Sequence, residues 1–258
     1  MSPRPPLENL RVMVTRPVHL AAHLSALLER AGADVIRRPC MEIVDCGETP
    51  ENLALVHDLR RYRLVVFVSR NAVEAGFNLL RVAGVSLPAD VPVAAVGVKT
   101  GERLALEGVA SVVNPVRAAG SEALLETAAV KSLDSGRVLV FRGEGGNELL
   151  ANTLRARGVE VDYAEVYRRR KPSGVRLLFG TPDDPDVILS ASAESLQNLY
   201  DLTAPASRDA LTAITVALGS AAMAGLHEHL GFRTPPVIAR SPVDEDMLDA
   251  VVRWWRKH

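Results

Sequence analysis

The chain has 258 residues, of which 48% are hydrophobic, and its 30 Lys and Arg residues against 31 Asp and Glu residues leave a net charge of −1. This length allows one large or two ordinary domains, and the hydrophobic fraction is sufficient for a full core. The balanced charge is atypical of proteins dedicated to nucleic acids or membrane surfaces, so neither partner is predicted.

Short apolar runs alternate with stretches of helical period along the whole chain. The runs predict β-strands over 11–15, 33–37, 64–69, 92–96, 110–113, 137–141, 159–164, 186–190, 213–217 and 236–239. The stretches between them predict helices, several of which end at a glycine that can serve as the C-cap: Gly32, Gly84, Gly108, Gly158 and Gly231. Alternating strands and helices indicate an α/β fold with parallel sheets flanked by helices.

The two halves of the chain repeat each other in sequence. The matching segments are Arg11–Pro17 with Arg137–Gly143, Gly32–Val35 with Gly158–Val161, Leu64–Ser69 with Asp186–Ser190, and Val93–Gly97 with Thr215–Gly219. We therefore expect two similar α/β domains. Two such domains would leave a cleft between them, and clefts between domains are common ligand sites.

Two segments interrupt the alternation, each after the second strand of a repeat. Residues 37–46 contain a proline and lack a helical period, and residues 163–172 form an extended, strongly basic run. We interpret both as linkers that cross between the domains. One domain would then be discontinuous, built from 1–37 plus 172–258, and the other would be the insert 42–166.

Polar or glycine-containing turns follow six of the predicted strands. In parallel sheets, ligands bind at the carboxyl ends of the strands, where the N-termini of the following helices offer free backbone N–H groups. A single Ser or Thr at such a place is usually a plain N-cap, but six turns would suit a ligand with several carboxylates or phosphates. The candidate binding residues are Thr15, Arg16, Ser69, Arg70, Gly97, Thr100, Arg142, Gly143, Ser190, Ser192 and Gly219.

No cofactor or metal motif is complete. Gly143–Gly146 does not match the dinucleotide-binding fingerprint, and Gly97–Thr100 lacks the first glycine of a P-loop. His19 and His23 are four residues apart, but no third ligand accompanies them. The sequence therefore predicts neither a cofactor nor a metal.

The cysteines and the hydropathy pattern favour a cytoplasmic protein. Cys40 and Cys46 match no zinc or redox spacing and are typical of reduced thiols. Residues 1–20 contain no apolar segment of the kind found in signal peptides, and no apolar run is long enough to span a bilayer.

Tyr167 is the strongest candidate for chemistry. It lies in the second linker beside Arg168, where a side chain could face the cleft. A phenol can donate a hydrogen bond or a proton at neutral pH. The alternative is that Tyr167 packs in the linker like any other aromatic side chain.

Taken in order, these motifs resemble the uroporphyrinogen-III synthase family over nearly the whole chain. The stretches that carry the resemblance are Val12–Pro17, Phe67–Val73, Ala95–Thr100, Ser121–Leu125, Arg142–Gly146 and Val166–Arg169. The family has two α/β domains joined by a two-stranded antiparallel linker, which agrees with the discontinuous layout inferred above.

The resemblance implies a reaction. The linear tetrapyrrole hydroxymethylbilane loses water and closes to uroporphyrinogen III with its last ring inverted, through a spiro intermediate and without cofactor or metal. Tyr167 corresponds to the family's candidate catalytic tyrosine, and Ser69 and Thr100 correspond to polar positions that line its cleft. A monomer is expected.

The second half departs from the family in one turn, which keeps other functions open. The family often has a threonine pair where this chain has Ala221 and Ala222, after Gly219. The main alternative is a catalytically inactive module of the same fold that senses a ligand or regulates another protein. A sugar- or nucleotide-binding α/β protein is a more remote alternative.

Overall fold

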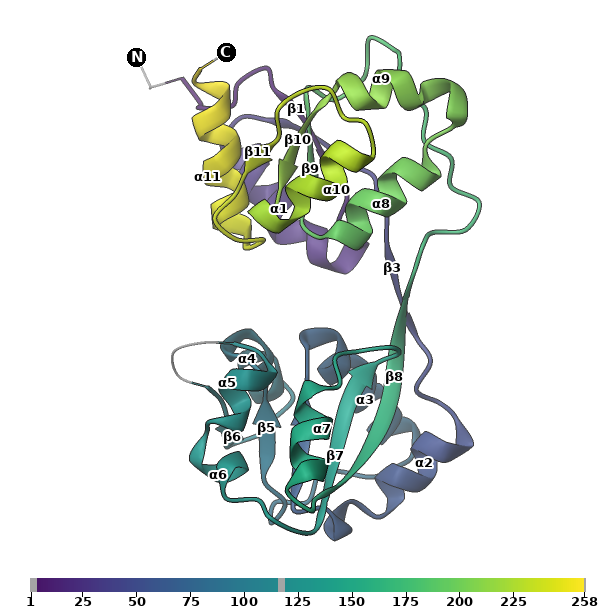
Figure 1. The fold of residues 1–258 in the computed structure, drawn as a ribbon, viewed down its shortest axis with the longest axis vertical. Coiled ribbons are helices and arrows are strands. Elements are labelled where there is room, and N and C mark those ends of the chain that lie inside the picture. Colours follow the sequence, from purple (N-terminus) through teal and green to yellow (C-terminus); the bar gives the residue numbers. More distant parts are fainter. Residues whose placement is uncertain (1–3, 116–118, 258) are drawn as a thin grey trace. The chain divides into compact units, whose positions relative to one another are not determined.

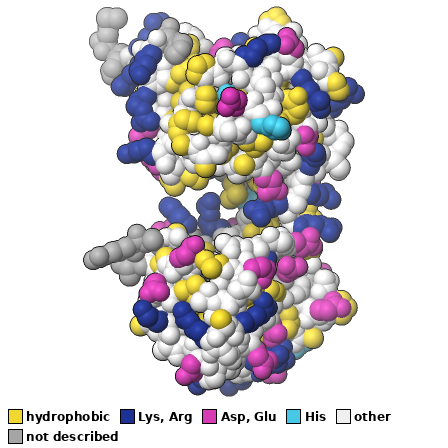
Figure 2. All heavy atoms as spheres, viewed as in Figure 1, with side chains coloured by type: hydrophobic (Ala, Val, Ile, Leu, Met, Phe, Trp, Pro, Cys, Tyr) yellow, Lys and Arg dark blue, Asp and Glu magenta, His cyan; other side chains and the backbone are white. Residues whose placement is uncertain are grey.

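The structure is a computed structural model that describes residues 4–115 and 119–257. The chain divides into two compact units. Unit 1 comprises the residues up to Glu42 together with those from Arg170 onward, and unit 2 is the continuous segment Ile43–Arg169. On the face shown in Figure 2, acidic and basic side chains are interspersed on both units, as the balanced composition leads one to expect.

Unit 1 is a five-stranded sheet with helices on both faces (Figure 1). The strands, all paired in parallel, follow the order β11-β10-β9-β1-β2. They are β1 (Arg11–Val14), β2 (Asp34–Arg37), β9 (Val187–Ser190), β10 (Thr215–Leu218) and β11 (Val237–Ile238). The helices are α1 (Val18–Arg30), α8 (Ala193–Leu202), α9 (Arg208–Ala213), α10 (Ala224–His229) and α11 (Asp244–Trp255), with 3-10 turns at Pro205–Ser207 and Ala221–Met223.

Side chains of the unit 1 strands alternate between two separate cores. Val12 and Val14 pack with α1 and α11, whereas Met13, between them, packs with Leu196 of α8 and Leu211 of α9. This alternation follows from the two-residue period of a strand. Since both faces are covered by helices, each strand contains consecutive apolar residues instead of alternating apolar and polar ones, as in other parallel sheets.

Unit 2 has a six-stranded sheet in the order β3-β8-β7-β4-β5-β6. Its strands are β3 (Glu42–Asp45), β4 (Leu64–Phe67), β5 (Val93–Ala95), β6 (Val112–Val113), β7 (Arg137–Gly143) and β8 (Glu160–Arg170). Its helices are α2 (Pro50–His57), α3 (Arg70–Val82), α4 (Val98–Leu106), α5 (Ser121–Leu125), α6 (Ala128–Lys131) and α7 (Leu149–Ala156), with a 3-10 turn at Leu59–Arg61.

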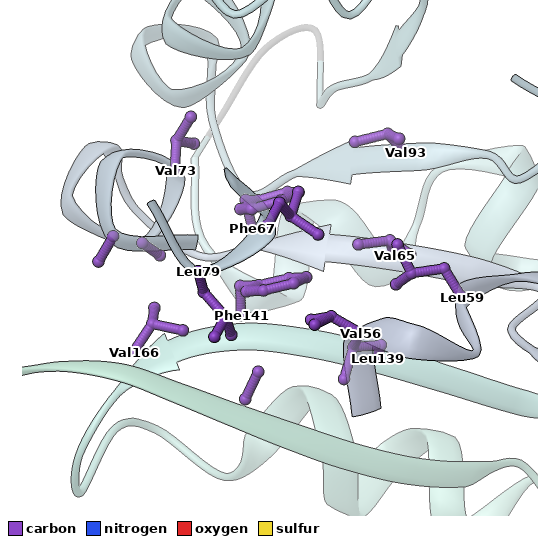
Figure 3. Close-up of a cluster of buried hydrophobic side chains, with 14 of the residues drawn as sticks. Val56, Leu59, Val65, Phe67, Val73, Leu79, Val93, Leu139, Phe141 and Val166 are labelled. Carbon is purple, nitrogen blue, oxygen red and sulfur yellow. The ribbon is translucent and has the colours of Figure 1, made fainter. Parts of the chain in front are cut away.

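One core of unit 2 is built around two stacked phenylalanines (Figure 3). The rings of Phe67 on β4 and Phe141 on β7 have centroids 4.6 Å apart and an interplanar angle of 4°. Val166 of β8 and Leu79 of α3 pack around them. The opposite face of the same sheet packs against α5, α6 and α7.

The sheets of the two units have the same order of equivalent strands. By the sequence repeats, β1, β2, β9 and β10 of unit 1 correspond to β7, β8, β4 and β5 of unit 2. Both sheets place these four strands in one order, with β11 and β6 following at the end. Gly32 and Gly158, which are equivalent in the repeats, both follow a helix with positive φ, 95° and 87°, as predicted for C-capping glycines. The predicted α/β fold with two similar sheets is confirmed.

The structure differs from the expected strands at the two interruptions. β8 continues to Arg170 instead of ending at 164, so most of the basic run belongs to a strand. The other interruption contains β3, which neighbours β8 in the sheet. Neither feature has a strong local signal, because the end of β8 is a run of charged residues and the edge strand β3 is short and carries charged residues at both ends.

Candidate active site

A cavity of about 360 Å³ lies in unit 2 at the carboxyl ends of β4 and β7. The strand order reverses between these two strands, since the chain runs from β4 to β5 and β6 on one side and from β7 to β8 on the other. Ligands of open α/β sheets bind at such a point. The predicted site residues that line the cavity are Ser69, Arg142, Gly143 and Tyr167.

The phenol of Tyr167 is held at the wall of this cavity. Its side chain comes from β8 and the residue is 7% exposed. The hydroxyl lies 3.1 Å from Oγ of Ser69, the residue that precedes α3. Ser69 Oγ also accepts a hydrogen bond of 3.0 Å from the backbone N–H of Ala72, so Ser69 is the N-cap of α3.

A β-bulge places Tyr167 over the backbone of Gly143. Arg142 of β7 pairs with Glu165, but Gly143 pairs with Tyr167, so β8 carries Val166 as one extra residue. The ring of Tyr167 then lies against the Cα of Gly143, where an added Cβ would be 2.6 Å from Cζ of the ring. Only glycine fits at this position without displacing the phenol.

Arg142 is the buried charge of the cavity. The residue is 3% exposed, and its Nη1 donates a hydrogen bond of 2.6 Å to Glu148. Its guanidinium stacks on the ring of Tyr163 at 4.3 Å, and the Tyr163 hydroxyl donates a 2.5 Å hydrogen bond to the other oxygen of Glu148. A buried arginine needs such partners, because an unpaired charge out of water is costly.

Glu148 and Tyr163 influence each other's protonation. The hydrogen bond from Tyr163, followed by that from Arg142, lowers the pKa of Glu148. Partial burial, followed by the hydrogen bond to Glu148, raises the pKa of Tyr163. The pair therefore favours a charged carboxylate beside a neutral phenol, which keeps Arg142 in place.

The remaining candidates of unit 2 lie near the cavity but do not line it. Gly97 and Thr100 lie at the start of α4, after the strand next to β4, and both are buried. Their neighbour Val96 lines the cavity. Arg70, the first residue of α3, is exposed and forms no ion pair with any residue that the structure describes.

In unit 1 the predicted residues also meet at one end of the sheet. Thr15 is fully buried, and its hydroxyl donates a 2.8 Å hydrogen bond to the carbonyl of Leu189 and lies 2.9 Å from Oγ of Ser195. Ser190 is also fully buried, and its hydroxyl donates to the carbonyl of Ser192. Ser192 is exposed and caps α8 through the N–H of Ser195.

Arg16 and Gly219 complete this end of unit 1. Arg16 forms an ion pair with Asp244, the first residue of α11, and donates to the carbonyl of Pro242. The N–H of Gly219 donates a 3.0 Å hydrogen bond to the carbonyl of Ser190, which ties together the ends of β10 and β9. Ala221 and Ala222, the pair that departs from the family, are exposed in the following 3-10 turn.

Sequence reasoning missed Tyr163 and Asn147, which line the cavity, and Glu148, which fixes Arg142 there. The spacing of Tyr163 and Tyr167 on one strand could have indicated a second phenol on the site. The partner of Arg142 could not be found in this way, because it depends on the loop that precedes α7.

His19 and His23, the two histidines spaced four residues apart, both lie on α1. His23 lies 2.7 Å from a carboxylate oxygen of Asp244. Within residues 4–115 and 119–257, no three His, Cys, Asp or Glu side chains are grouped so that they could hold a metal ion. Over the same ranges, no helix has the length and apolar character needed to cross a membrane.

Comparison with known proteins identifies the family. A family model described as uroporphyrinogen-III synthase HemD matches residues 22–249. The uroporphyrinogen-III synthase of Salmonella typhimurium is 28% identical over 197 residues, 75% of this chain and 80% of its own. That of Proteus mirabilis is 31% identical over 160 residues, 62% of this chain and 80% of its own.

Solved structures show the same fold. A mutant uroporphyrinogen III synthase from Thermus thermophilus superposes with a TM-score of 0.61 at 20% identity, covering 96% of this chain and 100% of that one. The Helicobacter pylori enzyme gives a TM-score of 0.58 at 15% identity, with coverage of 95% and 99%. The family model spans most of the sequence, and this chain therefore belongs to the uroporphyrinogen-III synthase family.

Proposed function

We propose that this protein is a uroporphyrinogen-III synthase, a cyclising lyase that converts hydroxymethylbilane to uroporphyrinogen III with loss of water and inversion of the last ring. The observation that carries the proposal is the family match over residues 22–249. The cavity at the strand reversal of unit 2 supports it, since it combines a phenol and a buried arginine at the place where an α/β sheet binds its ligand.

In this proposal Tyr167 is the catalytic residue. The hydroxymethyl group of the substrate leaves as water once its oxygen receives a proton, and the proposed donor is the hydroxyl of Tyr167, a residue that lines the cavity. Positioned acids typically contribute ~10²–10⁴-fold to a rate. We expect the lower end of this range, because the pyrrole nitrogen itself pushes the leaving group out.

The carboxylates of the tetrapyrrole are met by backbone N–H groups and polar side chains at helix N-termini. In unit 2 the proposed contacts are Arg70, Gly97, Thr100 and Arg142, and in unit 1 they are Arg16, Ser192 and Gly219. The hydroxyls of Thr15 and Ser190 are engaged within unit 1, so we assign these two residues to shaping the end of the sheet. Gly143 would act through its backbone.

The reaction product tests the function directly. Hydroxymethylbilane left alone closes to the uninverted isomer I, so the purified protein should yield isomer III when substrate is added. The two isomers are separated by chromatography after oxidation to the porphyrins. If isomer I is the sole product, the protein is not a synthase, and an inactive regulatory module becomes the better interpretation.

The enzyme is further proposed to act as a monomer in the cytoplasm and without a cofactor. The free thiols of Cys40 and Cys46 support a reducing compartment. Burial raises the pKa of Cys40 to about 12, which keeps this thiol protonated and unreactive. Light scattering of the purified protein would reveal the assembly state.

A further inference from the structure

The hydrogen bond between Tyr167 and Ser69 leaves the phenol proton available to a ligand only if Ser69 is the donor. Ser69 Oγ already accepts from the N–H of Ala72 at 3.0 Å, so its own hydrogen can be donated to Tyr167 at 3.1 Å. With Ser69 as the donor, the phenol hydrogen is not used within the protein. The N-cap of α3 thus links the positive end of that helix to the phenol oxygen.

Gly143 determines where that oxygen lies. The Tyr167 ring rests on the Gly143 backbone, and a Cβ there would come within 2.6–2.7 Å of two ring atoms. The ring cannot move aside freely, because Tyr167 is 7% exposed and packs in the core with Val166 and Phe141. The backbone on both sides is fixed as well, since the N–H of Glu144 donates to the carbonyl of Tyr167 at 2.9 Å.

We propose that Ser69 and Gly143 are positioning residues that act through Tyr167 instead of through direct contact with the substrate. Gly143 supplies the flat surface on which the phenol ring lies. Ser69 donates a hydrogen bond to the phenol oxygen, which directs the Tyr167 proton to the cavity and stabilises the phenolate that forms. This inference rests on the proposed function.

The proton balance of the reaction is consistent with this role. The C–O bond of the hydroxymethyl group breaks, and its oxygen leaves with the Tyr167 proton as water. A hydrogen bond donated by the Ser69 hydroxyl stabilises the negative charge left on the phenolate, and the Ser69 oxygen in turn accepts a hydrogen bond from the Ala72 N–H. Ring closure later releases one proton from the tetrapyrrole, which restores the phenol, so no external acid or base is consumed.

A double-mutant cycle tests the proposal. Ser69→Ala and Gly143→Ala are each made in the wild type and in Tyr167→Phe, and kcat and KM for hydroxymethylbilane are measured. In the wild type, Ser69→Ala should lower kcat about threefold to tenfold, the size of one neutral hydrogen bond, with KM little changed. Gly143→Ala should lower kcat at least about tenfold, because it displaces the proton donor. In Tyr167→Phe, each should change kcat by less than about twofold.

Further variants separate positioning from folding. Ser69→Thr retains the Oγ atom and should restore kcat to near the wild-type value. Thr49→Ala removes the N-cap of α2 in the same unit, and Gly136→Ala strains the residue before β7, which has a φ of 87°. Both should lower the melting temperature and leave kcat unchanged.

The outcomes are distinguishable. Equal losses from Ser69→Ala in the wild type and in Tyr167→Phe would show that Ser69 contacts the substrate directly, and the proposal would be wrong while the synthase function stands. Full activity of Gly143→Ala would exclude its positioning role. Isomer I alone from the wild-type protein would overturn the proposed function itself, independently of the cycle.

Discussion

Tyr167 is the residue on which the proposed chemistry depends. Its hydroxyl lies 3.1 Å from Ser69, and the ring is nearly buried, so removal of one oxygen leaves the packing intact. We expect Tyr167→Phe to remain folded and to lose about 10²-fold in kcat, since it lacks the proton donor. Isomer ratio and turnover measured on the same sample check this. Unchanged turnover would assign catalysis to the way the protein holds the bilane.

His227 should make unit 1 sensitive to acid. It is 3% exposed, stacks on Phe232 with ring centroids 4.7 Å apart, and its buried Nε2 has no hydrogen-bond partner among the described residues. Burial lowers its pKa below the ordinary value of 6.5, so the unfolded chain binds a proton more readily than the folded one. The contribution of neutral His227 to the free energy of unfolding is therefore fully present above pH 6.5, and we expect it to be lost as the pH falls below that value.

Melting temperatures at pH 7.5 and pH 5.5 test this prediction. His227→Phe retains an aromatic ring at the stack and should reduce the loss on acidification. His229→Gln, an exposed change on the same helix, should behave like the wild type. An equal acid-induced loss in His227→Phe and wild type would assign the effect to other groups.

At the scale of elements, the packing of α3 against Phe67 and Phe141 limits which residue fits in the interior of the helix. Gly76 lies in the helix interior, where a Cβ would be 2.8 Å from Phe141 and 2.9 Å from Phe67. Alanine gains about 1 kcal/mol in helix propensity, but overpacking a core costs about 1–3 kcal/mol. Because the stacked rings are enclosed, we expect the second effect to win, with Gly76→Ala destabilising by about 1 kcal/mol.

A second glycine provides the comparison. A Cβ added at Gly225 in α10 would meet no other atom within 4 Å, so Gly225→Ala should be neutral or slightly stabilising. Urea unfolding midpoints measure both variants. If Gly76→Ala is as stable as Gly225→Ala, the rings of Phe67 and Phe141 can move aside, and they do not restrict the residue at position 76.

At the scale of the whole molecule, each unit has its own cores. The buried clusters around Phe67 and around Val140 contain only unit 2 residues, and those around Val12 and Ile188 contain only unit 1 residues. No described cluster is shared between the units. A core of its own is what a segment needs to fold independently.

We therefore predict that residues 43–169 fold in isolation. The fragment should show a cooperative thermal transition and native-like helical circular dichroism. Unit 1 should likewise fold when Glu42 is joined to Arg170 by a short glycine linker, since these side chains already form an ion pair of 2.9 Å. A fragment 43–169 without a cooperative transition would show that its cores are insufficient.

Much of the fold was predictable because it follows from local patterns. The strands β1, β4 and β9 are apolar runs bounded by turn residues. Gly32 and Gly158 follow the ends of their helices and have positive φ. The sequence repeats predicted two similar sheets, since equivalent segments fold into equivalent elements. The ordered motifs also indicated the family, and the match over residues 22–249 confirms it.

The sequence by itself thus determined the fold class, the repeats, the family and Tyr167 as the residue to test. Only the tertiary structure decided which predicted residues share a cavity and what each one contacts. The bulge that sets Tyr167 on Gly143 depends on strand register, and the burial of Thr15 and the pairing of Arg142 with Glu148 depend on segments distant in sequence or on loop geometry. Strand periods and turn residues are local properties, whereas register and side-chain partners are fixed when strands pair and helices pack, so no local pattern could specify them.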